Sequence, residues 1–165
     1  MRKTRVWITL SCCLLALAVF AWAQATRKPG LWEVTTTMTW QQSPFPGGAP
    51  PGAGGPRTTQ VCVTQAQIDK FGGPPPQTRG NCQVTNFQKS LNGVSAEMEC
   101  TGNMTGKGTF AATLIDEDHA KTKVHMSGSF QRGASPTPFE WTMESSAVFK
   151  GADCGSVQPI ATPGN

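Results

Sequence analysis

The chain has 165 residues, with 14 Lys or Arg against ten Asp or Glu, and its formal net charge at neutral pH is +4. Three of the basic residues lie in the first 23 positions, which contain no acidic residue, so the rest of the chain has 11 basic residues against ten acidic ones. A balance this close to neutral gives no support for a surface that binds nucleic acid or anionic membranes.

Residues 1–23 predict a secretory signal peptide. Arg2, Lys3 and Arg5 precede an apolar run that ends in the small-residue pattern Ala21-Trp22-Ala23. A retained membrane anchor is the alternative, but the run is shorter than the roughly 20 apolar residues that a span needs. We therefore expect cleavage after Ala23, one domain over residues 24–165, no membrane span after cleavage, and a periplasmic or secreted location.

Cleavage leaves four cysteines, Cys62, Cys82, Cys100 and Cys154. An even number in an exported protein predicts two disulfides. Zinc binding is disfavoured because no two of the four form a C-x-x-C pair and the two histidines are remote from them in sequence. No metal or other cofactor is predicted.

The first predicted strand covers residues 31–40, in which Trp32, Val34, Thr36, Met38 and Trp40 share one face. Residues 43–57 are rich in Pro and Gly and predict a flexible loop. A strand over residues 58–63 follows, with Val61 and Val63 on the face opposite to Cys62. Thr64 is then expected to cap a short helix over residues 65–71, which Gly72, Gly73 and three prolines end.

Residues 82–100 predict a β-hairpin with a two-residue turn at Asn92-Gly93. In that register Cys100 faces Thr85 and Cys82 lies on the other face, so these two cysteines are not expected to bond to each other. Two pairings remain. We favour Cys62–Cys82 with Cys100–Cys154, because the first bond would close the loop that contains the helix and the second would anchor the C-terminal end. The other pairing is Cys62–Cys100 with Cys82–Cys154.

The remaining chain predicts further strands. Residues 101–108 predict a glycine-rich turn, since their spacing does not match a phosphate-binding loop. Residues 109–115 and 120–130 predict a second hairpin around an acidic tip at 116–119. In its second arm one face is predicted to be buried and holds Thr122, Val124, Met126, Gly128 and Phe130, and the other is predicted to be wet and holds Lys121, Lys123, His125, Ser127 and Ser129. After a link rich in proline, residues 139–149 predict a last strand, and residues 156–165 a tail. The inward side chains of that strand are predicted to be Phe139, Trp141, Met143, Ala147 and Phe149.

Together these patterns predict an all-β fold, an antiparallel meander of about six to eight strands with one short helix and two disulfides. A barrel or a sandwich would both satisfy such a pattern, and consecutive hairpins favour a curled sheet or an up-and-down barrel. Trp32, Trp40, Met126 and Trp141 are candidates for lining an apolar pocket, although ordinary core packing also explains them.

Candidates for chemistry are weaker. Asp116, Glu117 and Asp118 with His119 could hold a cation, but their spacing matches no calcium loop, and a solvated hairpin tip is the favoured interpretation. His125 falls on the predicted wet face with no nucleophile at a recognisable spacing. Serine-hydrolase signatures are absent from the sequence, and oxidised cysteines disfavour thiol catalysis.

Four stretches carry a family resemblance: PGLWEVTTTM at 29–38, QVCVTQAQ at 60–67, the hairpin between Cys82 and Cys100, and Asp153-Cys154-Gly155. With these the chain resembles the bacterial secreted family called domain of unknown function 3617, over roughly residues 28–154. The long Pro-Gly insertion and the segment after Cys154 depart from the usual pattern. The resemblance implies an exported bacterial protein and carries over no catalytic residue.

We therefore expect an exported envelope protein that acts as a binding or structural module. Its partner would be an apolar small molecule or another envelope protein, and not nucleic acid. A lipocalin-like carrier of a small apolar ligand is the alternative, and an enzyme is the least favoured class.

Overall fold

A computed structural model describes residues 27–48, 54–76, 81–132 and 135–161. The predicted signal peptide at 1–23 lies outside the described residues, as do residues 49–53 of the predicted flexible loop. In the part that is described, no helix is both long enough and apolar enough to cross a membrane.

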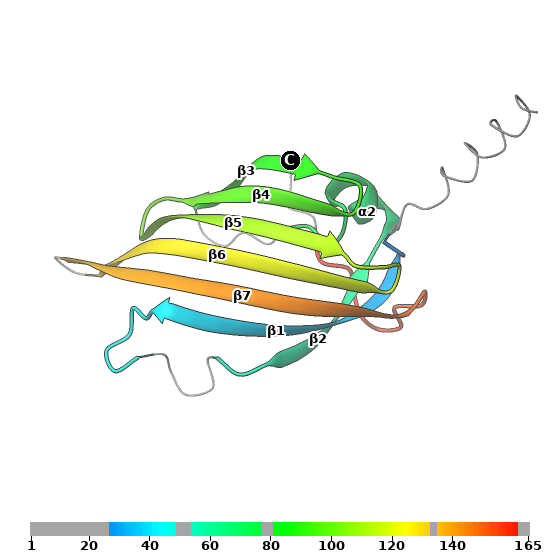
Figure 1. The fold of residues 1–165 in the computed structure, drawn as a ribbon, viewed down its shortest axis with the longest axis horizontal. Coiled ribbons are helices and arrows are strands. Elements are labelled where there is room, and N and C mark those ends of the chain that lie inside the picture. Colours follow the sequence, from blue (N-terminus) through cyan, green and yellow to red (C-terminus); the bar gives the residue numbers. More distant parts are fainter. Residues whose placement is uncertain (1–26, 49–53, 77–80, 133–134, 162–165) are drawn as a thin grey trace, which may run out of the picture.

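Seven strands and one short helix make up the described chain (Figure 1). In chain order they are β1 (Gly30–Gln42), β2 (Arg57–Val63), α2 (Gln65–Phe71), β3 (Cys82–Lys89), β4 (Gly93–Cys100), β5 (Met104–Leu114), β6 (His119–Arg132) and β7 (Ser135–Gly151). The predicted helix at 65–71 and the predicted all-β class are confirmed.

The strands form one antiparallel sheet in the order β2-β1-β7-β6-β5-β4-β3. Every pair of strands consecutive in sequence is adjacent except β2 and β3, and β7 returns beside β1. This is the connectivity of an up-and-down barrel that is open between β2 and β3. The closed barrel among our alternatives is therefore wrong, and the curled sheet is correct.

Helix α2 connects the two open edges and lies at one end of the sheet (Figure 1). Thr64 begins it with the predicted cap: its hydroxyl accepts from the Gln67 amide (3.2 Å), and the Gln67 side chain accepts from the Thr64 amide (3.0 Å). Gly72 ends the helix in the left-handed region at φ 71°, where a Cβ would collide with Val94 of β4. Glycine at this position therefore lets the end of the helix sit against the sheet.

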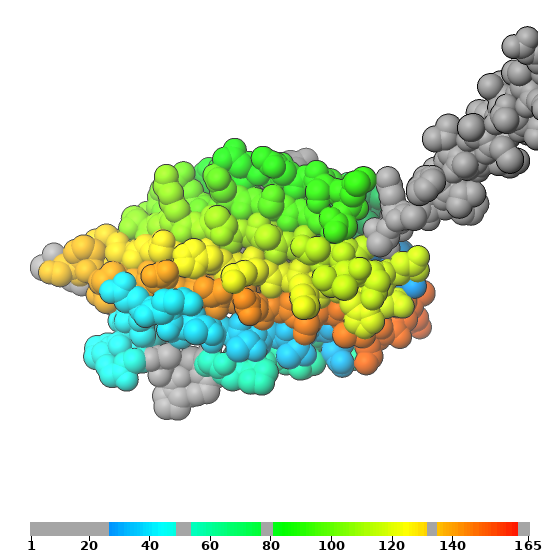
Figure 2. All heavy atoms as spheres, viewed as in Figure 1, coloured from blue at the N-terminus to red at the C-terminus, as the bar shows by residue number. Residues whose placement is uncertain are grey.

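The sheet has an apolar inner face and a polar outer face. Two clusters of buried side chains lie on the inner face, one around Trp32, Val63, Leu114 and Ala120 and the other around Cys100, Met126 and Phe139. Figure 2 shows the side chains of β4, β5, β6, β7 and β1 lying in that order across the molecule. The predicted alternation of faces in β1, β6 and β7 is thus the alternation that builds the core.

The disulfides are Cys62–Cys154 and Cys82–Cys100. The expectation that Cys82 and Cys100 do not bond to each other is therefore wrong. Both pairings that depended on this expectation are wrong with it, including the favoured one. Cys82 lies directly opposite Cys100 in the ladder between β3 and β4. Their neighbours Asn81 and Thr101 share a hydrogen bond (3.0 Å), so the cysteines occupy the adjoining non-hydrogen-bonded position, where opposed side chains are closest.

Two features account for the difference of three residues between the predicted and the observed register of β3 and β4. The first is the turn, which encloses Leu91-Asn92 because the Ser90 amide donates to the Gly93 carbonyl (2.8 Å). This turn lies one residue earlier than predicted, and the earlier position shifts the pairing by two residues. A bulge between Thr85 and Gln88, with Asn86 at φ 50°, shifts it by one more. Gly93 lies within β4, where a Cβ would overlap the Ala112 carbonyl oxygen of β5.

Two segments expected to be irregular belong to strands. β5 begins at Met104, so the predicted turn at 101–108 ends early, and Gly108 lies beneath the Met126 side chain, where a Cβ would sit 2.7 Å from its Sδ. β7 begins at Ser135 and includes Pro136 and Pro138 of the predicted link. Proline is tolerated there because β1 pairs with β7 only from Glu140 onward, which leaves this end of β7 as an edge.

The predicted tail after Cys154 contacts the domain over its described part. Pro159 bridges to Cys62 of β2, and the Ile160 carbonyl accepts from the buried side chain of Gln67 at 2.7 Å. Residues 162–165 lie outside the described residues.

Candidate functional site

The inner face of the sheet encloses an apolar hollow of about 460 Å³. All seven strands contribute to its walls, and Phe71 at the end of α2, the prolines 74–76 and Ile160 also line it. The volume lies within the range of roughly 300–1,000 Å³ that is typical of small-molecule sites. We call this cavity the hollow.

The walls of the hollow are adaptable in shape. Four methionines line it, Met98, Met104, Met126 and Met143. Unbranched thioether side chains rearrange at low cost, and surfaces rich in them accommodate ligands of varied shape. The disulfide Cys82–Cys100 also lies in the wall, whereas Cys62–Cys154 does not.

Three of the four predicted pocket residues, Trp32, Met126 and Trp141, line the hollow. Trp40 does not line it: its ring packs edge-on against Phe45 at 6.0 Å between centroids. The buried Trp40 Nε1 has no hydrogen-bond partner among the described residues. The structure therefore brings three of the candidates to one cavity and places the fourth in the neighbouring core.

Arg27 is the one charged side chain among the described residues that line the hollow. Its guanidinium carbon lies 5.1 Å from the centroid of the Trp32 ring, and its Nη1 occupies the space that a Cβ at Gly73 would fill. Burial lowers the pKa of Arg27. Sequence reasoning missed this residue because it lies in a short polar segment before β1, where no periodicity assigns a side chain to a face.

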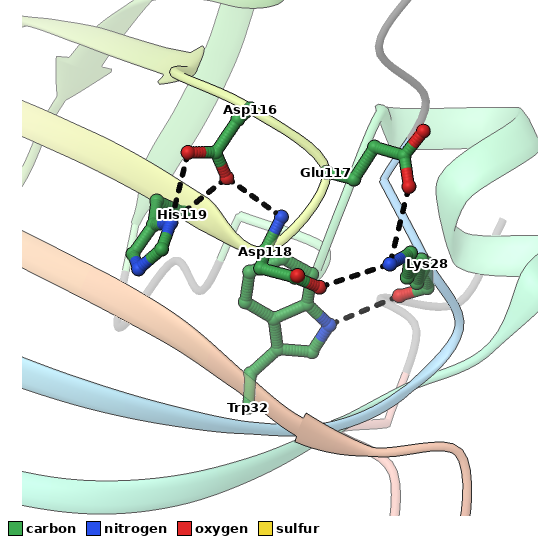
Figure 3. Close-up of polar contacts among 6 residues, drawn as sticks. All are labelled: Lys28, Trp32, Asp116, Glu117, Asp118 and His119. Atoms are coloured by element: carbon green, nitrogen blue, oxygen red, sulfur yellow. Dashed lines mark hydrogen bonds and ion pairs between the residues drawn. The ribbon is translucent and has the colours of Figure 1, made fainter.

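The adjacent Lys28 is paired with two carboxylates (Figure 3). Its Nζ lies 3.0 Å from Asp118 Oδ1 and 3.2 Å from Glu117 Oε2, both at the tip between β5 and β6. The hydrogen bonds from Lys28 to Asp118 and then to Glu117 raise the pKa of the ammonium. The Lys28 carbonyl accepts from Trp32 Nε1 at 3.0 Å, so Trp32 is held by Lys28 on its polar edge and covered by Arg27 on its ring.

The acidic tip is occupied by protein groups. Asp116 accepts from the Asp118 amide (2.8 Å) and lies 2.8 Å from His119 Nδ1 (Figure 3). The backbone hydrogen bond from Asp118, followed by the His119 side chain, lowers the pKa of Asp116. Within the described residues no three His, Cys, Asp or Glu side chains are arranged to hold a metal ion. Through the contacts of Glu117 and Asp118 with Lys28, the tip holds the segment before β1 in place.

His125 lies on the outer face, away from the hollow. Its Nε2 is 3.6 Å from Glu140 Oε1 and its Nδ1 is 3.4 Å from Thr142 Oγ1. These contacts join β6 to β7 across the wet side of the sheet.

The fold and the hollow define a class of protein: a disulfide-linked, open and curled antiparallel sheet with an apolar cavity on its inner face and Arg27 in the wall of that cavity. The chain belongs to the family described as Protein of unknown function (DUF3617), whose match covers residues 27–154 and so runs from Arg27 to the last cysteine. No curated protein and no solved structure matches the chain.

Proposed function

We propose that the protein is an exported bacterial protein that binds a small apolar molecule in the hollow. The observation that carries this proposal is a cavity of about 460 Å³ on the face where a solid core would otherwise lie, walled mainly by apolar side chains. Of the two binding classes considered from sequence, the lipocalin-like carrier has the better support, because a structural module needs no such space.

Export to the periplasm or beyond is part of the same proposal. The leader at 1–23 and the two disulfides support it, since structural disulfides persist in oxidising compartments. Carriage of an apolar molecule through an aqueous compartment requires that its apolar surface be covered, and the mainly apolar lining of the hollow, to which all seven strands contribute, supports that role.

Binding is also proposed in preference to catalysis. The described lining contains one charged side chain and two oxidised cysteines, and the titratable groups Asp116, His119 and His125 lie at the hairpin tip or on the outer face. General acid–base chemistry needs a proton donor or acceptor within hydrogen-bond reach of the substrate. An arginine, which stays protonated at neutral pH, is poorly suited to that role.

Tryptophan fluorescence tests the proposal directly. The chain after residue 23 contains three tryptophans, and Trp32 and Trp141 line the hollow whereas Trp40 does not. A brominated long-chain alcohol, which quenches on contact, is expected to quench Trp32 and Trp141 in a saturable manner and to leave the emission of Trp40 largely unchanged. Single-tryptophan variants separate the three signals.

A matched pair of variants locates the binding. Ala112 lines the hollow and its neighbour Ala111 is exposed on the opposite face of β5. Ala112→Phe fills the space and is expected to weaken binding about tenfold or more, while Ala111→Phe leaves it unchanged. Circular dichroism checks that both variants fold. Quenching that is absent in the wild type, or that survives in a folded Ala112→Phe variant, would overturn the proposal.

A further inference from the structure

Arg27 is a partly buried cation with no anionic partner among the residues that the structure describes. All ten Asp and Glu residues of the chain lie in its described part, and none of them pairs with Arg27. The acidic side chains of Glu117 and Asp118 pair instead with Lys28, the residue that follows Arg27. An ion held away from water without a counter-charge is costly, and the usual compensation is an anion or hydrogen-bond acceptor.

The position of Arg27 is fixed by groups that do not neutralise its charge. The Trp32 ring lies beneath the guanidinium at 5.1 Å, and Trp32 is itself held by its hydrogen bond to the Lys28 carbonyl. Gly73, which follows the end of α2, provides the space for Nη1. A planar guanidinium held in this way still presents its hydrogen-bond donors to a bound group, and such donors match a carboxylate in paired geometry.

Space for a polar group adjoins the hollow at Arg27. A second pocket of about 150 Å³ shares Arg27, Gly72, Val94 and Ala112 with the hollow. A water molecule takes about 30 Å³ of liquid volume, so this pocket has room for a small charged group together with a few waters. Lys89 also lines the pocket, but its Nζ contacts the carbonyl oxygens of Ile68 and Asp69 at the end of α2. Among the described residues that line the two pockets, Arg27 is therefore the cation whose hydrogen-bond donors are not directed at protein carbonyl groups.

From this arrangement we infer that the hollow binds an amphiphile with an anionic head, whose apolar chain lies against the methionine-lined wall and whose head group is held by Arg27 in the adjoining pocket. The inference rests on the proposed function and names its ligand class: a single-chain carboxylate of the fatty-acid type. Arg27 is the charged residue that the two compartments share, which matches a molecule with one charged end and one long apolar end.

Three probes of one chain length separate charge from apolar binding. Binding of dodecanoate, 1-dodecanol and dodecyltrimethylammonium to the full mature chain is measured by tryptophan fluorescence below the concentrations at which they self-associate. We expect dodecanoate to bind about tenfold more tightly than dodecanol, because the head group gains charge-assisted hydrogen bonds, and the cationic probe to bind most weakly.

Variants then assign the preference to Arg27. Arg27→Gln is expected to remove the preference for dodecanoate over dodecanol, and Arg27→Lys is expected to keep part of that preference. Arg57→Gln is the matched control, because Arg57 is an exposed residue of β2 that does not line the hollow. Full retention of the preference in this control is expected.

The outcomes distinguish the two proposals. Equal binding of dodecanoate and dodecanol, or a preference that survives Arg27→Gln, overturns the anionic-head inference and leaves apolar binding intact. Binding of neither probe overturns both. If Arg27→Gln and Arg57→Gln lose the preference for dodecanoate equally, the net charge of the protein selects the anion and Arg27 does not. This outcome too overturns the inference.

Discussion

Removal of each disulfide is expected to destabilise the protein by a different amount, because the two bonds close loops of different length. Cys62 and Cys154 are 92 positions apart, and Cys82 and Cys100 are 18 apart. Cross-linking reduces the entropy of the unfolded chain by about 2.1 cal/mol/K plus 1.5R times the logarithm of the loop length. At 25 °C this amounts to about 4.6 kcal/mol for the long loop and about 3.2 kcal/mol for the short one.

Packing does not obscure the comparison. Each disulfide has one buried cysteine, Cys62 at 6% and Cys100 at 4% exposure, and one half-buried cysteine. The double variants Cys62→Ala/Cys154→Ala and Cys82→Ala/Cys100→Ala therefore lose similar contacts, and the loop difference of about 1.4 kcal/mol should dominate their difference in the free energy of unfolding.

Urea unfolding followed by tryptophan fluorescence measures both costs, after peptide mapping of the non-reduced protein has established the connectivity. The variant lacking Cys62–Cys154 should unfold at the lower urea concentration. A larger cost for the short loop, or a proteolytic fragment in which Cys62 is joined to Cys82, would refute the reasoning.

Three further predictions concern stability. Phe139→Ala should lower the free energy of unfolding in urea by about 3–5 kcal/mol, since Phe139 is 1% exposed and packs on Phe130 at 4.7 Å between ring centroids. Leu91→Ala, at a residue that is 77% exposed, should lower it by less than about 0.5 kcal/mol. Similar costs for the two variants would contradict the assigned core. Gly93→Ala should cost about 1–3 kcal/mol through its clash with the Ala112 carbonyl, and Gly151→Ala, where a Cβ meets nothing within 4 Å, should be neutral in the same assay. Because the folded-state pKa of Asp116 is lowered, its stabilising contribution is complete above the unfolded value of about 3.9 and is lost as pH falls through the folded value. The stability difference between wild type and Asp116→Asn should therefore shrink between neutral pH and pH 2, and a constant difference would count against the tip contacts.

The sequence was sufficient to predict the faces of most strands, because their apolar alternation is also what packs the inner face. Val124 and Met126 of β6 and Phe139 of β7 are buried as their pattern predicts. The helix at 65–71 was predictable with its ends, since a capping threonine and a terminal glycine act locally. Both signals need no knowledge of the rest of the chain.

Register and pairing were not predictable in the same way. The Asn-Gly pair is a strong turn signal, yet Gly93 is in a strand because β5 passes too close for a side chain, which is a contact between elements. The bulge at Asn86 has no local signature of comparable strength. Since a single residue of slip exchanges the two faces of a strand, these small errors were enough to reverse the disulfide assignment.

The hollow was predictable in its composition and not in its polarity. Tryptophans and methionines on alternating positions indicate an apolar interior, and three of the four named residues line the cavity. Arg27 enters that cavity through tertiary contacts with Trp32 and Gly73, which lie 5 and 46 positions away in sequence. A charged side chain that is positioned by residues distant in sequence produces no periodic pattern from which its location could be predicted.

The two outer edges of the sheet affect whether one molecule of the protein can pair its strands with those of another. Beside Cys62 the free side of β2 is already occupied by Pro159, and β3 is bent at Asn86 out of a flat ladder. These features interrupt the row of unpaired amides and carbonyls at one place on each edge, and such interruptions disfavour the edge-to-edge pairing through which β-proteins polymerise.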